Sequence, residues 1–163
     1  MAVVNLRNIW PLPATLLVAM MLTLMPLPDW ARAIRPDWLG LLAIFWSMVL
    51  PRTFSIGSAW IVGLLLDAII QAPFGQNALG LVIIVYITSR MNEHLLSAPL
   101  IQQTMFVFIL LLTRQVLTVW INGISGHLPP TLTLLWLPPL LSVILWPWLF
   151  ILLRNLARRY RMI

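Results

Sequence analysis

Cysteine and lysine are both absent from this chain of 163 residues, and charged residues of any kind make up only 9% of it. Without cysteine there is no disulfide framework, thiol nucleophile or thiolate metal site. The two histidines, His94 and His127, stand too far apart for a metal-ligand motif, so no metal or other cofactor is predicted. Since about 25% of the residues in a soluble domain are charged, this chain has too few charges to cover a water-exposed surface.

Hydrophobic residues, in contrast, make up 61% of the chain, and the mean hydropathy is +0.98. They form long runs without charge, which suit membrane helices, whereas the strands of a membrane barrel need alternation of polar and apolar residues. The sequence therefore predicts an all-α integral membrane protein, with residues 1–163 forming a single transmembrane domain. Six transmembrane helices are predicted, at residues 8–28, 36–51, 54–71, 77–90, 100–122 and 131–153.

The positions of the arginines predict how these helices are oriented. The segments on one side of six spans contain Arg7, Arg52, Arg90, Arg154, Arg158, Arg159 and Arg161. The loops on the other side contain only Arg32 and Arg35, which stand near Asp29 and Asp37. Because basic residues concentrate on the cytoplasmic side, both termini are predicted to be inside (N-in and C-in). Arginines scattered between apolar runs indicate contact with membrane lipid and no binding of nucleic acid.

Asp67 and Arg114 are the ionisable residues that stand well inside apolar runs. A charged group at membrane depth is costly unless it is paired or hydrated, so each is a candidate functional residue. From the starts of their spans, Asp67 lies about 20 Å deep and Arg114 about 21 Å deep, on helices that run in the same direction. We expect either an intramembrane Asp67–Arg114 ion pair or, alternatively, an Arg114 that snorkels to the outer interface while Asp67 caps the turn at residues 71–75.

Other patterns bear on activity. The four acidic residues are spread over both faces of the predicted membrane domain, and the sequence has no phosphate-binding loop, zinc-protease motif or Ser-His-Asp set. An enzyme needs several polar groups that converge at one depth, so the chain is predicted not to be an enzyme. Pro138, Pro139 and Pro147 fall within the sixth predicted span and predict a kinked or broken helix there. Such a helix either lines a substrate cavity or bends around its neighbours.

Several fragments of the sequence resemble the MreD family of rod-shape-determining membrane proteins. The resemblance covers nearly the whole chain in length, order and spacing of the fragments. The fragments are 35–39, Phe45-Trp46, Leu50-Pro51, Gly57 to Trp60, 63–67, Pro73-Phe74-Gly75, Tyr86, 145–150 and Leu152-Leu153-Arg154.

This resemblance implies a non-enzymatic scaffold of the elongasome, in the bacterial inner membrane, that helps to organise lateral peptidoglycan synthesis and rod cell shape. The implied direct partner is MreC, through which the chain would connect to RodA, a class B penicillin-binding transpeptidase and MreB. The fold implied is similar to the substrate-binding subunits of energy-coupling-factor transporters. That similarity leaves an alternative function open, a small-ligand-binding membrane subunit of a transporter, whose pocket would be lined by polar side chains.

A scaffold of this kind is expected to receive a partner helix on small residues, for which Gly57, Gly63 and Gly80 are the candidates. Its periplasmic contacts are expected at Arg35 and Asp37 and at Pro73 and Gly75. On this basis Gly63→Leu is expected to weaken MreC association without affecting membrane insertion.

Overall fold

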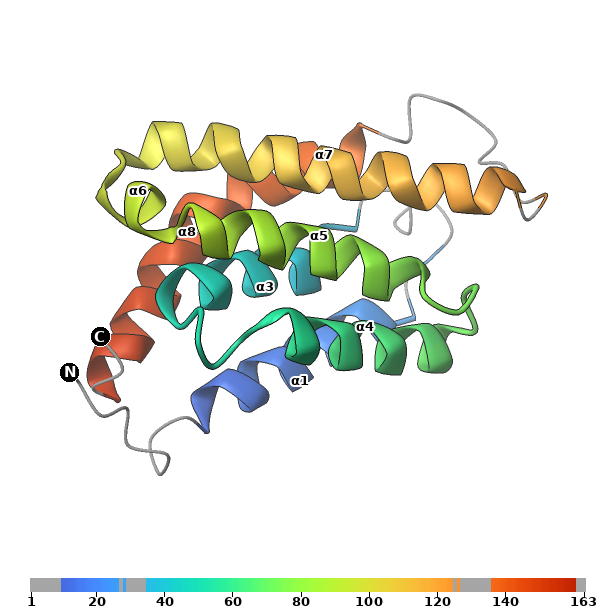
Figure 1. The fold of residues 1–163 in the computed structure, drawn as a ribbon, viewed down its shortest axis with the longest axis horizontal. Coiled ribbons are helices and arrows are strands. Elements are labelled where there is room, and N and C mark those ends of the chain that lie inside the picture. The colour runs from blue at the N-terminus through green and yellow to red at the C-terminus, as the bar shows by residue number, and fades with distance from the viewer. Residues whose placement is uncertain (1–9, 27, 29–34, 125, 127–135, 161–163) are drawn as a thin grey trace.

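Helix α3 (Trp38–Val49) lies at the centre of the fold in the computed structural model, which describes residues 10–26, 28, 35–124, 126 and 136–160. Every residue from Leu39 to Met48 is buried, because four other helices and a short one pack around α3. The described residues form helices and turns but no strand (Figure 1). The other helices are α1 (Pro11–Leu24), α4 (Ile56–Ile70), α5 (Gln76–Arg90), α6 (Asn92–Ser97), α7 (Leu100–Ile124) and α8 (Leu137–Arg159).

Apart from the short α6, successive helices run in opposite directions, so the fold is an up-and-down bundle (Figure 1). Each of these six helices overlaps one of the six ranges that the sequence predicted, but α5 begins one residue early at Gln76, α7 continues to Ile124, and α8 extends past its predicted end at residue 153 to Arg159. Residues 8–9, 27 and 131–135 of the predicted helices lie outside the described residues, as do Arg7, Arg32 and Arg161. Among the described helices, α7 and α8 are long and apolar enough to cross a membrane, while α1, α3 and α4 are shorter apolar helices.

The residues at the starts of α3 and α8 explain why these two helices begin where they do. The Asp37 side chain accepts a hydrogen bond from the Gly40 backbone N–H (2.9 Å), which caps the first turn of α3. In α8, Pro138 and Pro139 stand in the first turn, where the missing N–H of proline has no intrahelical partner to lose. The helix then continues through Pro147. The predicted break is therefore absent, because two of the three prolines fall at a position that a helix tolerates, while a kink at Pro147 remains a prediction.

The interior contains a cluster of aromatic rings that joins α3 to α8. Phe45 packs edge-on against Phe150 of α8 and against its neighbour Trp46. The Trp46 indole N–H donates a hydrogen bond to the Thr15 hydroxyl of α1 (2.9 Å), so α3 is bound on this side by a directed polar contact as well as by packing.

Gly63 brings α4 and α5 into backbone contact. A Cβ atom at Gly63 would lie 2.3 Å from Cα and 2.7 Å from N of Ala78, which is closer than real Cβ contacts come. The close approach that this glycine permits is therefore to a helix of the same chain. The expectation that Gly63→Leu acts on a partner helix alone does not fit this geometry, because the new side chain would first separate α4 from α5.

We predict that Gly63→Leu destabilises the bundle by about 1–3 kcal/mol or more, since the overlap is with backbone atoms that have no rotamer to change. Gly57→Leu is the matched control on the same helix, because a Cβ there meets nothing closer than the Ser55 hydroxyl at 4.0 Å. Thermal unfolding in detergent, followed by tryptophan fluorescence, measures both variants. Equal melting temperatures for the two variants would show that the α4–α5 contact is not tight.

Candidate functional site

Asp67 is fully buried near the end of α4, where its carboxylate caps the following helix. It accepts hydrogen bonds from the backbone N–H groups of Gly75 and Asn77 (both 3.0 Å) and of Ala78 (3.4 Å). The first N–H groups of a helix have no intrahelical acceptor, and the helix dipole favours a negative charge at this end. Asp67 thereby satisfies the start of α5 from a residue on α4.

Asn77 carries this contact onward to α7. Its side-chain N–H₂ donates to Asp67 Oδ1 (2.8 Å), and its Oδ1 accepts from Arg114 Nη2 (2.8 Å). The Asn77 amide therefore donates to the carboxylate of Asp67 and accepts from the guanidinium of Arg114. Arg114 lies in α7 and is only 7% exposed, so its charge is held inside the bundle.

The second arm of Arg114 reaches the start of α3. Arg114 Nη1 forms a salt bridge and hydrogen bond with Asp37 Oδ2, while Asp37 Oδ1 caps α3. The Asp37 backbone N–H donates to the Ser142 hydroxyl of α8 (2.8 Å), which in turn donates to the Pro138 carbonyl (2.7 Å). We call Asp67, Asn77, Arg114, Asp37 and Ser142 the polar relay. It connects α4, α5, α7 and α8 to the start of α3.

Two glycines leave the space that the relay needs. A Cβ at Gly80 would lie 2.8 Å from Cγ of Arg114, and one at Gly40 would lie 2.5 Å from Oδ2 of Asp37. The stem of Arg114 can pass α5 because Gly80 has no side chain. Gly80, like Gly63, thus serves a contact within this chain.

The direct Asp67–Arg114 ion pair expected from the sequence does not form. The two residues do lie near one another, but Asn77 stands between them and Arg114 pairs with Asp37 instead. The alternative expectation is met for Asp67, which caps the turn into α5, but not for Arg114, which is buried and does not snorkel. The depth calculation correctly predicted that the two residues lie near one another, but it gave no information on which helix faces meet.

The predicted partner residues fall into two groups. Arg35 donates to the carbonyls of Thr23 and Met25 at the end of α1, and Asp37 belongs to the relay, so both hold the bundle together. Gly57 and Pro73 are exposed, and Gly75 adopts a positive φ of 93°. Contact of any of these residues with a partner remains a prediction.

The turn at residues 71–75, which we call the Phe74 turn, joins α4 to α5. Its backbone is fixed by Gln71 in the left-handed region (φ 55°) and by the bond from Gly75 N–H to Asp67. Phe74 projects from it with 82% of its surface exposed. A buried carboxylate thus anchors a turn that carries an exposed aromatic ring.

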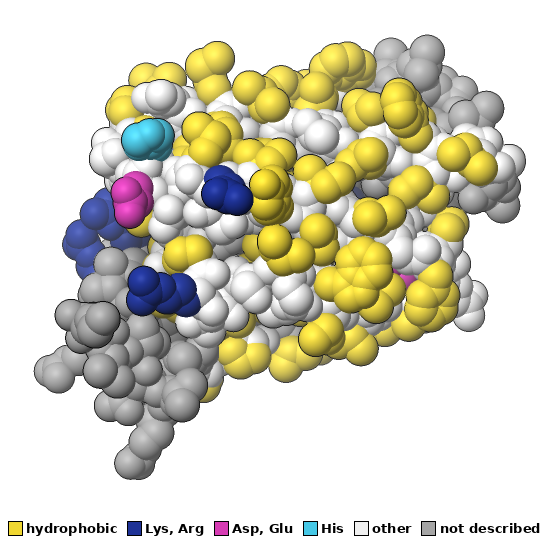
Figure 2. Space-filling model, in the orientation of Figure 1, with side chains coloured by type: hydrophobic (Ala, Val, Ile, Leu, Met, Phe, Trp, Pro, Cys, Tyr) yellow, Lys and Arg dark blue, Asp and Glu magenta, His cyan; other side chains and the backbone are white. Residues whose placement is uncertain are grey.

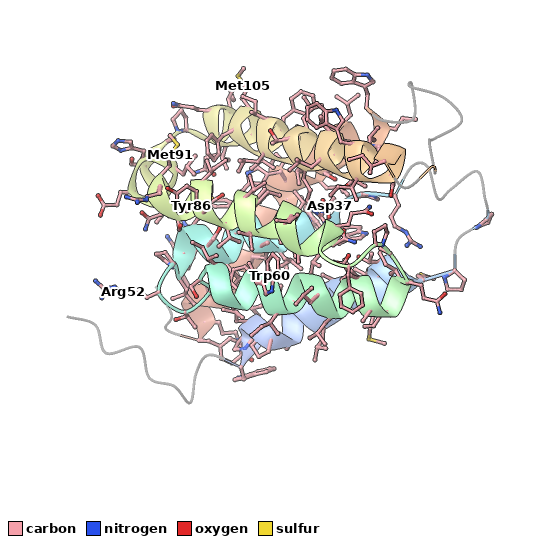
Figure 3. All side chains as sticks on the ribbon, turned by 45° about the vertical axis from the view of Figure 1, so that its right-hand side comes forward. Asp37, Arg52, Trp60, Tyr86, Met91 and Met105 are labelled. Atoms are coloured by element: carbon pink, nitrogen blue, oxygen red, sulfur yellow. The ribbon has the colours of Figure 1, made fainter. Side chains whose placement is uncertain are left out.

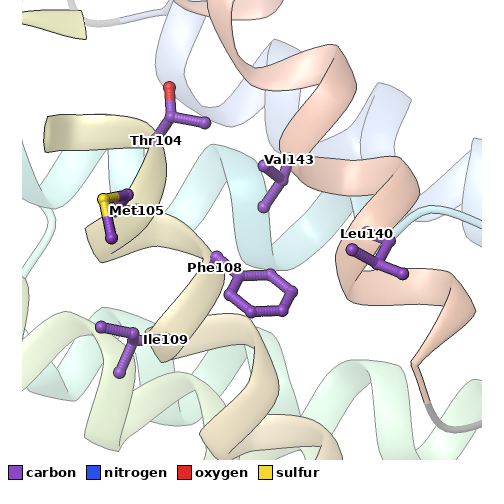
Figure 4. Close-up of a pocket in the computed structure, with 6 residues that line it drawn as sticks. All are labelled: Thr104, Met105, Phe108, Ile109, Leu140 and Val143. Atoms are coloured by element: carbon purple, nitrogen blue, oxygen red, sulfur yellow. The ribbon is translucent and has the colours of Figure 1, made fainter. Parts of the chain in front are cut away.

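Two hollows on the surface are lined almost wholly by apolar side chains. One has a volume of about 270 Å³ and lies between α7 and α8, where Phe108, Leu140 and Val143 face one another (Figure 4). The other, of about 440 Å³, lies between α1 and α8 over α3. The Thr104 and Thr15 hydroxyls in their walls donate to carbonyls of their own helices. These hollows fit hydrocarbon better than a polar ligand.

The opposite end of the bundle from the Phe74 turn is basic. Arg52, Arg90, Arg154, Arg158 and Arg159 are all exposed there, and we call this region the basic end. Figure 2 shows arginines, an acidic side chain and a histidine around this end, while hydrophobic side chains are spread over the rest of the described surface in this view. Figure 3 places Asp37 toward the other end from Arg52, with Trp60 of α4 between them.

Asn77 and Ser142 are the relay members that sequence reasoning missed. Both are single polar residues beside or within apolar runs, and Asn77 directly follows the Phe74 turn. Uncharged polar residues are common in membrane helices, so their type alone gave no reason to single them out.

Comparison with known proteins gives two matches. The family model described as rod shape-determining protein MreD matches residues 7–156. The chain is also 29% identical, over 148 residues, to the rod shape-determining protein MreD of Haemophilus influenzae, and the match covers 89% of each chain. No solved structure matches the chain.

We predict that Asp37 and Arg114 are the strongly coupled pair of the relay. Asp37→Asn and Arg114→Gln each remove one partner of an ion pair in which Arg114 is buried and Asp37 is partly exposed, so the cost should approach, without reaching, the about 3–5 kcal/mol of a fully buried pair. In a double-mutant cycle the Asp37–Arg114 coupling should exceed the Asp67–Arg114 coupling, because the second pair is bridged by Asn77. Melting temperatures of the purified variants measure both cycles. A larger coupling for Asp67 with Arg114 would contradict the relay geometry.

Proposed function

We propose a function that proceeds from one premise: this chain belongs to the MreD family of rod shape-determining proteins. Family membership supports a role in rod shape determination, and the apolar helices are consistent with a membrane protein. Our proposal is that the chain acts as a non-enzymatic membrane scaffold of the elongasome. It would bind MreC and so help to organise lateral peptidoglycan synthesis.

We propose that the chain spans the bacterial inner membrane six times, with both termini in the cytoplasm. The alternating directions of the helices support this arrangement (Figure 1). So does the gathering of exposed arginines at one end of the bundle, which by the positive-inside rule would face the cytoplasm. The Phe74 turn would then face the periplasm.

The observation that carries the scaffold proposal is the exposed Phe74 on a turn that Asp67 fixes from inside. Beside it, α4 packs mainly on α5 and leaves Ile61, Leu65 and Ile69 exposed in a line along its other side, with Trp60 exposed next to Ile61. Together these residues form a continuous apolar surface that runs along α4 and ends in an aromatic ring. We call it the α4 surface and propose that it receives the membrane helix of MreC and the start of its periplasmic part.

A non-enzymatic role fits the use that the bundle makes of its buried polar groups. Asp67 and Asp37 cap helices, and Arg114 joins them, so each is engaged in holding the fold. RodA, the class B transpeptidase and MreB would be reached through MreC and would not touch this chain directly.

The alternative is a small-ligand-binding membrane subunit, as in energy-coupling-factor transporters. It requires polar groups that converge on a pocket, whereas the two hollows described above are apolar. We therefore rank the scaffold role first. Analysis of small molecules in the purified protein distinguishes the two functions, since a transporter subunit would retain a stoichiometric polar ligand.

We predict that Phe74→Ala and Trp60→Ala each reduce the amount of MreC that co-purifies with the tagged chain from mild detergent. Both truncations remove exposed anchors, and aromatic anchors at an interface contribute about 2 kcal/mol or more. Trp120→Ala is the control, since Trp120 is also an exposed aromatic residue but lies on α7. Equal recovery of MreC with all three variants, at normal levels of the chain, would overturn the assignment of the α4 surface.

A further inference from the structure

The hollow between α1 and α8 has the shape and length of a site for a single hydrocarbon chain. Its walls run along α1 from Trp10 to Leu22, about 18 Å at 1.5 Å per residue. One leaflet accounts for half of a hydrocarbon core of about 30 Å, so the hollow has roughly the depth of one leaflet. Its volume of about 440 Å³ is within the range of roughly 300–1,000 Å³ usual for small-ligand sites.

The lining of this hollow is apolar from end to end. Ala14, Val18 and Leu22 form the α1 side, and Leu42 of α3 forms part of the floor. The hydroxyl of Thr15, the polar group in the wall, is already bonded to the Leu12 carbonyl and to the Trp46 indole. Nothing in this lining would hold a polar molecule, but an acyl chain would contact apolar side chains along its whole length.

One end of the hollow opens beside the basic end of the bundle. On α8 the lining residues Trp148, Leu152 and Leu156 lie one turn apart on one helix face, and Arg159 continues the same line three residues later. Arg159 is exposed, and no partner for its guanidinium occurs among the described residues. A cation thus stands where the head group of a lipid in the hollow would emerge.

Aromatic groups complete this end. Trp10 lines the hollow, is half exposed, and packs edge-on against the Tyr160 ring at 5.1 Å between centroids. Amphipathic rings of this kind settle at the level of lipid head groups. The rings and Arg159 therefore mark the same depth, which is the boundary between hydrocarbon and head group.

We propose that the hollow between α1 and α8 binds an anionic phospholipid of the surrounding membrane, with an acyl chain between the helices and its phosphate against Arg159. The negative charge of the lipid complements the basic end, where Arg52, Arg90, Arg154 and Arg158 also raise the local potential. A bound lipid would fill the groove between α1 and α8 and connect the first and last helices of the bundle. This site is separate from the α4 surface.

The test is native mass spectrometry of the purified chain with added phosphatidylglycerol or phosphatidylethanolamine of identical acyl chains. We expect phosphatidylglycerol to remain bound preferentially. Arg159→Gln should weaken its retention about fivefold, the contribution of one basic residue at a membrane surface. Arg158→Gln is the matched control, since Arg158 is also exposed but does not continue the line of lining residues. Equal losses from the two variants would show a diffuse basic surface and overturn the proposal.

A second pair of variants tests the hollow itself. Ala14→Phe places a ring inside it and should reduce retention of both lipids, whereas Leu17→Phe on the exposed side of α1 should not. Size-exclusion profiles establish that both variants fold. The proposal fails if Ala14→Phe leaves lipid retention unchanged. If that variant also loses co-purifying MreC, the hollow binds a partner helix and not a lipid. Lipid retention is read independently of MreC, so the scaffold function and the lipid site can fail separately.

Discussion

The salt bridge between Arg114 and Asp37 is the contact on which the arrangement of the bundle depends. Arg114 also binds Asn77, and Asn77 binds Asp67, so one guanidinium links the starts of α3 and α5. In an apolar environment a charge that loses its partner is far more costly than in water. The network therefore strongly favours the helix positions that keep these charges paired. Hydrophobic packing alone would allow α7 to slide or rotate against α3, whereas the forked contacts of Arg114 fix its depth and its face.

The charged residues lie at the two ends of the bundle, and they have a different role at each end. At one end, Asp67 and Asp37 cap helices and hold the Phe74 turn, so the charge is internal and shapes an apolar outer surface. At the other end, five exposed arginines face outward from helix ends and turns. The first arrangement is suited to a protein partner and the second to the anionic surface of a membrane. The scaffold that we propose would need both, since it would sit at a fixed depth in the membrane and present one face to a partner.

Much of this fold followed from simple features of the sequence. Charge-free runs predicted where the six main helices lie, and the depth arithmetic placed Asp67 and Arg114 near one another. The partners of these residues were not predictable, because the choice between Asp37 and Asp67 depends on the rotation of α7 about its own axis. The glycines show the same limit: Gly63 and Gly80 were recognised as sites of close approach, but only the structure shows that α5 and Arg114 are what approach them. Whether Gly57 meets a partner stays a prediction.

The most direct test of the scaffold account is site-specific photocrosslinking in living cells. A photoreactive amino acid is placed at position 74 or 60, both on the α4 surface, or at position 120 on α7, and crosslinked proteins are identified. The account predicts a crosslink to MreC from Phe74 and Trp60 and none from Trp120. Crosslinks to MreC from position 120 with none from 74 or 60 would contradict it, because the partner would then lie against α7, which α5 separates from α4 and the surface that Asp67 holds in place.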